Sequence, residues 1–166
     1  MGVAAGNVEG PGLVTTLLLP FDLVLIGPPG HRLAAGPPAP FAELASEYQL
    51  VTRAGERTVP GQILERLAME HGVRLQAPLE LGDVDTLLQA VSSGIGVTAT
   101  DLPSVAQRLA RNDMVVLQVE GFPIRMGWHL VHRGHALAPP ARLLRDFLAR
   151  FPWPSGVLRA QPGVLE

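Results

Sequence analysis

Cysteine is absent from this chain of 166 residues. Its absence excludes disulfide bonds, thiolate metal sites and cysteine nucleophiles, and it is compatible with a reducing compartment. Basic residues are few and scattered, because 13 Lys and Arg stand against 15 Asp and Glu, for a net charge of −2. A domain that binds nucleic acid usually gathers its basic residues on one face. The composition therefore argues against DNA binding by this chain itself.

Long hydrophobic runs are also missing, since Pro20, Asp22 and Pro28 interrupt the most apolar stretch. We therefore expect no membrane span. The N-terminus lacks a basic segment followed by a continuous apolar segment, so we expect no secretion signal and a cytoplasmic location. Hydrophobic residues make up 47% of the chain, which is enough to bury a core. The length fits one domain or two small lobes that share a hinge.

The order of predicted elements is an alternation of strands and helices. Strands are predicted over 17–26, 48–52, 77–81, 97–100, 114–119 and 128–132, and helices over 41–46, 60–71, 83–93, 103–111 and 139–151. Such an alternation is typical of an α/β domain with a mainly parallel sheet. The tail 152–166, rich in Pro and Gly, is expected to be flexible.

Local signals place several helix ends. Pro60 suits a first helical turn, and Gly72 suits the position after the last turn. Asp83 is a credible N-cap, and Asp85 would lie in the first turn of the same helix. These structural roles explain the two carboxylates, so we do not interpret them as a catalytic acid–base pair. Gly94 is expected to end that helix.

Motifs for catalysis or metal binding are not supported. Gly94 and Gly96 follow a helix and precede a strand, the reverse of a dinucleotide-binding turn. His129, His132 and His135 are spaced three residues apart. The first two lie on a predicted strand, where residues three apart point to opposite faces, and His135 follows that strand. We therefore expect no metal site. The chain has no Gly-x-Ser-x-Gly elbow and no phosphate loop with Lys. We therefore expect neither an enzyme nor a cofactor.

Four stretches taken in order carry a family resemblance. They are 79–97, 113–125, 128–133 and 137–148, preceded by a strand and turn at 25–34 and a lead-in at 41–44. Their order and spacing resemble the effector-binding domain of LysR-type transcriptional regulators, and most of all the branch that regulates the RuBisCO operon. Each stretch alone is weak evidence for the family, whereas the whole set in this order is strong evidence.

The resemblance implies an α/β fold of the type II periplasmic-binding-protein-like kind, with two lobes of which lobe one is incomplete. Residues 1–23 would be a remnant of lobe one and 24–131 lobe two. Residues 132–151 would be a crossover and a C-terminal helix returning to lobe one, and 152–166 a flexible tail. DNA would be bound only through a helix-turn-helix absent from this chain. The implied partners are a small-molecule metabolite and further copies of the intact regulator, with no membrane.

The candidate effector site joins a turn, a strand and one position near the N-terminus, with seven residues in all: Ala5, Thr52, Gly55, Glu56, Thr58, Thr98 and Thr100. The turn connects a strand end to a helix start, where free N–H groups and the helix dipole favour anions. In RuBisCO-operon regulators this turn reads Gly-Ser-Gly-Thr-Arg. Here Glu56 replaces Ser, and its carboxylate disfavours an anionic effector. Ala5 falls where some relatives carry an arginine.

Simpler interpretations of these residues stay open. The turn could be a solvated loop with a helix cap, and Thr98 and Thr100 could be buried threonines bonded to backbone. If the site exists, Thr58 and Thr98 should approach one cleft. Two other functions also remain open: a solute-binding protein of a transporter, which shares the two-lobe fold, and a small α/β enzyme.

Overall fold

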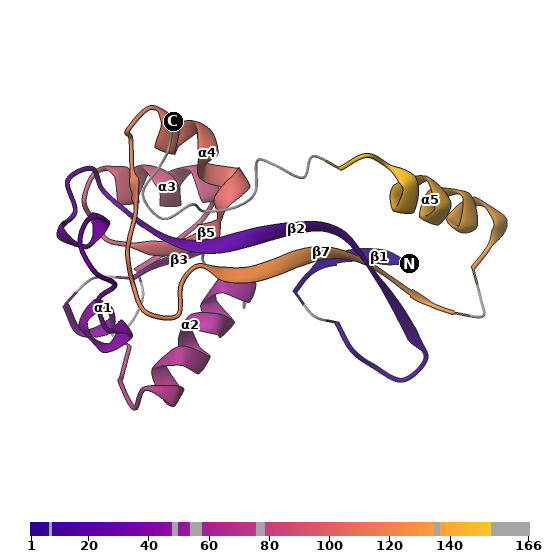
Figure 1. Cartoon of the computed structure of the whole chain (residues 1–166), viewed down its shortest axis with the longest axis horizontal. Coiled ribbons are helices and arrows are strands. Elements are labelled where there is room, and N and C mark those ends of the chain that lie inside the picture. The colour runs from indigo at the N-terminus through magenta and orange to yellow at the C-terminus, as the bar shows by residue number, and fades with distance from the viewer. Residues whose placement is uncertain (7, 48–49, 54–57, 76–78, 135–136, 154–166) are drawn as a thin grey trace. The chain divides into compact units, whose positions relative to one another are not determined.

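A computed structural model describes residues 1–6, 8–47, 50–53, 58–75, 79–134 and 137–153 (Figure 1). The strands are β1 (Gly2–Ala5), β2 (Leu13–Gly27), β3 (Val51–Arg53), β4 (Leu79–Leu81), β5 (Thr98–Asp101), β6 (Val115–Val116) and β7 (Ile124–Arg133). The helices are α1 (Phe41–Glu47), α2 (Val59–Glu70), α3 (Val84–Ser92), α4 (Leu102–Ala110) and α5 (Pro139–Arg150), with a 3₁₀ helix η1 at Arg32–Ala34.

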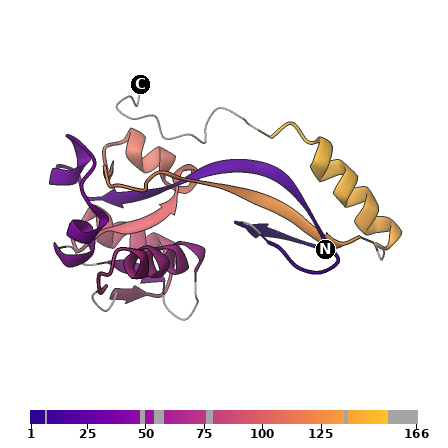
Figure 2. The same cartoon turned by 60° about the horizontal axis from the view of Figure 1, so that its bottom comes forward.

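The chain forms two compact units. Unit 1 contains Met1–Asp22 and the described residues 125–153, and unit 2 contains residues 23–124. The sequence predicts bounds of 24–131 for lobe two. Two strands, β2 and β7, contribute residues to both units and are neighbours in one sheet, side by side in Figures 1 and 2.

Strand direction differs from the prediction of a mainly parallel sheet, which is wrong for the larger sheet. That sheet has the order β1-β7-β2-β5, with β6 also on β2, and its pairs β1–β7, β2–β5 and β2–β6 are antiparallel. Parallel pairing joins β3 to β4, and a parallel bridge joins Leu50 to Val97 just before β5. Alternation with helices sets the common direction of β3, β4 and β5. It does not set the direction of β2, because the strands that pair with β2 depend on tertiary packing.

Unit 2 has a core on each face of its strands, and Figure 1 shows α2 on one side of them and α3 and α4 on the other. Leu25 and Ala99 belong to the first core, and Val24 and Ile26 to the second. The helices fill the first core with Phe41, Leu44, Leu64 and Leu67, and the second with Leu88, Val91, Val105 and Leu109.

The buried face and the C-terminal end of helix α2 both follow from local features of its sequence. The side chains of Leu64, Leu67 and Ala68 are buried, because their spacing places them on one face of a 3.6-residue repeat. Gly72 has φ +64°, and its N–H donates to the Met69 carbonyl oxygen, as expected after the last turn.

Unit 1 combines three strands with one helix. β1 pairs with β7 from Gly2↔Val131 to Ala5↔Trp128, a short strand near the N-terminus that the predicted elements did not include. Arg125 Nη1 donates to Asp22 Oδ1 at 2.8 Å, and the Asp22 side chain is only 8% exposed. Helix α5 has no buried residue. Among the described residues, no helix has the length and apolar character needed to cross a bilayer.

Candidate functional site

Three helices begin where the parallel strands of unit 2 end. α2 follows β3, α3 follows β4 and α4 follows β5, and these three strands run in one direction. The first turns of all three helices therefore lie at the same edge of the strands. Backbone N–H groups in first turns have no helical partner, and in open α/β sheets this edge is where ligands collect.

At two of the three helix starts, an Asp carboxylate accepts a hydrogen bond from a first-turn N–H group. Asp83 Oδ1 accepts from Thr86 N at 2.8 Å, and Asp101 Oδ1 accepts from Ser104 N at 3.0 Å. The backbone hydrogen bond from Thr86, then that from its hydroxyl, lowers the pKa of Asp83. A fixed negative charge at these starts opposes a second anion.

The third helix start, α2, carries a neutral cap. The Thr58 hydroxyl accepts from Gly61 N at 3.2 Å, and Pro60 occupies the first turn. No carboxylate among the described residues caps this helix. Of the three helix starts, α2 is therefore the one whose capping side chain carries no negative charge.

The predicted turn residues are only partly described. Thr52 lies in β3, where its backbone pairs with Glu80. Thr58 is the N-cap of α2. Gly55 and Glu56 lie outside the described residues.

Thr98 and Thr100 share one face of β5. They pair with Ile26 and Val24 in β2, and residues directly opposite in an antiparallel pair point to the same face. That face is the one covered by α3 and α4, whereas α2 packs on the other face. The structure therefore does not bring Thr98 and Thr58 together on one face. Their part in effector binding stays a prediction.

The two threonines also differ in accessibility. Thr98 is 4% exposed, whereas Thr100 is partly exposed and directly precedes the cap residue Asp101. Ala5 lies in unit 1, opposite Trp128 in the β1–β7 pair. Its methyl group supplies neither charge nor a hydrogen bond.

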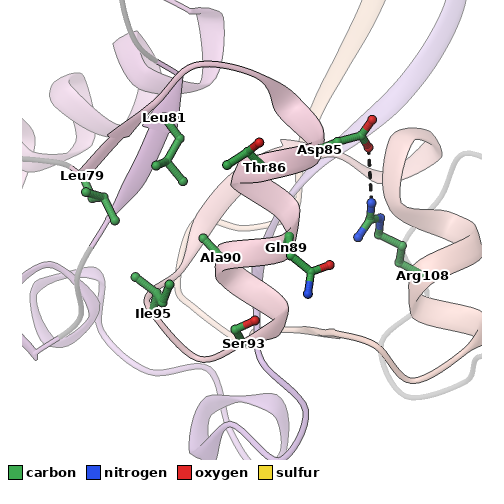
Figure 3. Close-up of a pocket in the computed structure, with 9 residues that line it drawn as sticks. All are labelled: Leu79, Leu81, Asp85, Thr86, Gln89, Ala90, Ser93, Ile95 and Arg108. Carbon is green, nitrogen blue, oxygen red and sulfur yellow. Dashed lines mark hydrogen bonds and ion pairs between the residues drawn. The ribbon is translucent and has the colours of Figure 1, made fainter.

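A shallow hollow of about 550 Å³ lies beside β4 and α3 (Figure 3), and sequence reasoning did not find it. Its apolar lining comes from Leu79, Leu81, Ala90 and Ile95, and its polar lining from Asp85, Thr86, Gln89, Ser93 and Arg108. The lining offers apolar contact and hydrogen bonds. The Arg108–Asp85 ion pair, at 3.2 Å, is solvent-exposed on the Asp85 side and gives no buried acid–base pair.

Histidines do not form a metal site in the part of the chain that the structure describes. His132 is buried, and His129 Nδ1 lies 3.0 Å from the carbonyl oxygen of Gly127. His135 falls outside the described residues.

Sequence reasoning also missed the cap Asp101, although the pattern Asp-Leu-Pro-Ser from 101 to 104 is a local signal for a helix start.

Comparison with known proteins gives a family match over nearly the whole chain. The model of the LysR substrate binding domain matches residues 1–152. The chain is 34% identical to the RuBisCO operon transcriptional regulator of Allochromatium vinosum over 149 residues, which is 89% of this chain and 48% of that protein. It is 30% identical to the transcriptional regulator CbbR of Rhodospirillum rubrum, over 79% of this chain and 43% of that one. The chain spans less than half the length of these relatives.

Solved structures show the same fold. The regulatory domain of Synechocystis PCC6803 CcmR in complex with 2-PG superposes with a TM-score of 0.75 at 23% identity, covering 89% of this chain and 70% of that one. The effector binding domain of QuiR in complex with shikimate superposes with a TM-score of 0.68 at 18% identity. The type II periplasmic-binding-protein-like α/β fold predicted from the sequence is thereby confirmed, as is the resemblance to regulators of the RuBisCO operon.

Proposed function

This chain belongs to the LysR substrate binding domain family, and from that premise we propose that it is the effector-binding part of a transcriptional regulator. It would bind a small metabolite and, in the intact regulator, shift the population of conformations of a DNA-bound oligomer. The observation that carries the proposal is the family match over residues 1–152, together with 34% identity to a RuBisCO operon regulator.

The proposed role is binding and not turnover. The relatives are transcriptional regulators, and the described residues hold no cluster of groups able to bind a metal. DNA would be contacted through a helix-turn-helix outside these 166 residues, and the intact regulator would act as a homo-oligomer in the cytoplasm.

We place the effector at the N-terminal end of α2. Thr52 lies in β3 and Thr58 is the N-cap of α2, and Gly55 and Glu56 fall between them in the sequence. The neutral cap at Thr58 supports the placement. Thr100 is a further candidate because it lies at the C-terminal end of β5 and is partly exposed.

Thr98 and Ala5 are weaker members of the proposed site. Thr98 is buried among the residues of unit 2, which agrees with a structural threonine as well as with a ligand contact. Ala5 could contribute only an apolar surface to a ligand.

The ligand class follows from the chemistry of the turn. A helix start with free N–H groups favours an acid, while the extra carboxylate of Glu56 weakens the attraction. Two structural neighbours were solved with 2-PG and with shikimate. We propose a small polar metabolite that carries an acidic group, bound more weakly than it would be without Glu56.

A thermal-shift screen tests this function. The purified chain is heated with 2-PG, shikimate and a panel of small phosphorylated and carboxylated metabolites. A ligand of the folded state raises the melting temperature in a saturable way. We expect at least one such metabolite, and a Thr100→Val variant that melts like the parent but responds less. If no member of the panel shifts the melting temperature, the proposed function is not supported.

A solute-binding protein of a transporter remains the alternative, because it shares the fold. The identity to transcriptional regulators, at 30–34% over most of the chain, favours the regulator.

A further inference from the structure

The hollow beside β4 and α3 has an apolar wall on one side. Leu79 and Leu81 come from β4, and Ile95 follows the end of α3. Ile95 is 52% exposed and Leu79 is 37% exposed, so both side chains keep apolar surface in contact with water. Leu81 also packs against the second core of unit 2, which holds the wall in place. Covering this apolar surface with a ligand would lower the free energy.

Arg108 of α4 lies on the other side of α3 (Figure 3). The Arg108 side chain is 29% exposed, and its Nη2 donates to Asp85 Oδ1 at 3.2 Å. The Asp85 side chain is 92% exposed, and an ion pair so open to water contributes little to stability. A guanidinium carries further N–H donors in a planar fork that fits a carboxylate. Arg108 is therefore placed to donate to an acidic group of a ligand.

Short side chains of α3 form the floor between Arg108 and the apolar wall. Thr86, Ala90 and Ser93 lie there, with the Gln89 amide on the side of Arg108 (Figure 3). The hollow of about 550 Å³ has the size of a small-molecule site, for which about 300–1,000 Å³ is usual. Apolar walls with a few polar groups are also typical of such sites. The arrangement suits a ligand with an apolar body and one polar end.

We propose that this hollow binds an amphipathic carboxylic acid, a molecule with a hydrocarbon ring or chain and a single carboxylate. The hydrocarbon covers Leu79, Leu81 and Ile95, and the carboxylate pairs with Arg108. The lining comes from β4, α3, α4 and residues 93 and 95, whereas α2 packs on the other face of the strands. The hollow is therefore separate from the start of α2, and the inference does not depend on effector binding there.

Asp85 sets a charge condition on the ligand. Its carboxylate shares Arg108 with an acidic ligand and repels the negative charge of that ligand. A neutral ligand of the same shape would gain only the apolar contact. Removing the charge of Asp85 should therefore strengthen the binding of an acid and leave the binding of its neutral analogue unchanged.

Calorimetric titration of the full chain with 2-naphthoate tests the proposal. This probe has two fused hydrocarbon rings and one carboxylate, and 2-naphthamide keeps the rings without the charge. We expect saturable binding of 2-naphthoate with one site per chain. Binding of 2-naphthamide should be about tenfold weaker, because only the acid forms a charge-assisted hydrogen bond with Arg108. Prior addition of 2-PG should leave the 2-naphthoate titration unchanged, because the start of α2 is a separate place.

Four variants locate the ligand. Arg108→Gln and Ile95→Ser should each weaken 2-naphthoate binding about tenfold, through loss of the ion pair and of apolar contact. Asp85→Asn should strengthen it about threefold and leave 2-naphthamide binding unchanged. Arg111→Gln is the matched control, because Arg111 is exposed at the C-cap of α4 and makes the same charge change as Arg108→Gln. It should have no effect. None of the four side chains is buried, so each variant should melt like the parent.

Four results would overturn the proposal. The first two are the absence of saturable 2-naphthoate binding and binding that Arg108→Gln and Ile95→Ser leave unchanged. The third is equal affinity for the acid and the amide. The fourth is displacement of 2-naphthoate by 2-PG, which would place both ligands at one site. A dimer in sedimentation that Leu79→Asp disrupts and 2-naphthoate does not would equally contradict it, because a second copy of the chain would then occupy the hollow.

Discussion

The fold changes the ionisation of His31. Its Nδ1 accepts from Leu33 N at 3.2 Å, so the ring caps η1 in its neutral form. Burial, and then the charge of Arg32, lower the pKa of His31 below 6.5. The neutral ring is therefore favoured in the folded state.

The sign of the pH dependence follows. A histidine with a lowered folded pKa binds fewer protons when folded, so stability falls as pH drops below 6.5, the unfolded value. We expect the melting temperature of the parent to decline from pH 7 toward pH 5. His31→Asn keeps a cap acceptor without titration and should decline less. Parallel pH curves for the two proteins would refute this assignment.

Asp22 and Arg125 form the second residue-scale case. Removing the guanidinium takes from the buried Asp22 carboxylate the ion pair that it makes with Arg125 at 2.8 Å. We expect Arg125→Met to lower the free energy of unfolding by about 2 kcal/mol, discounted because Arg125 is itself half exposed. Adding Asp22→Asn should recover more than half of the loss, because the buried side chain is then neutral. Chemical denaturation measures both, and a fully additive double variant would contradict the coupling.

At the scale of elements, Asp101 is the clearest test of a helix start. Its carboxylate caps α4 through Ser104 N and also accepts from Ser104 Oγ at 2.6 Å. We expect Asp101→Ala to cost about 1 kcal/mol, whereas Asp101→Asn, which keeps a cap acceptor, should cost much less. Equal losses in urea unfolding would show that the cap hydrogen bond is not the cause.

Element ends were predictable because their causes are local. Asp83, Pro60, Gly72 and Gly94 each act within a few residues, and the structure confirms the helix start or stop that each predicts. The direction of β2 was not predictable, because it depends on pairing with β5, more than 70 residues along the chain.

The candidate site also has one part that follows from local sequence and one part that does not. Its place at the start of α2 follows from a local strand–turn–helix pattern. The face taken by Thr98 depends on its register with Ile26, a non-local pairing that no pattern within β5 encodes. Sequence reasoning therefore grouped Thr98 with Thr58, and the structure separates them by face.

At the scale of the whole molecule, net charge governs contact with nucleic acid. With a net charge of −2 and scattered arginines, the chain should not retard RuBisCO-type promoter DNA at moderate salt. A gel-shift titration checks this expectation. Specific retardation by the purified chain, competed by unlabelled promoter and not by random DNA, would contradict it.

Calorimetric titration with 2-PG measures whether this chain binds a small acidic metabolite at the start of α2. We expect saturable binding with one site per chain. Glu56→Gln should tighten it by about threefold to tenfold, because one like charge is removed near the ligand. Glu70→Gln makes the same charge change at the far end of α2, where Glu70 pairs with Arg66 at 3.6 Å, and should have no effect. Absence of binding in all three proteins, or equal effects of the two substitutions, would contradict metabolite binding at the start of α2.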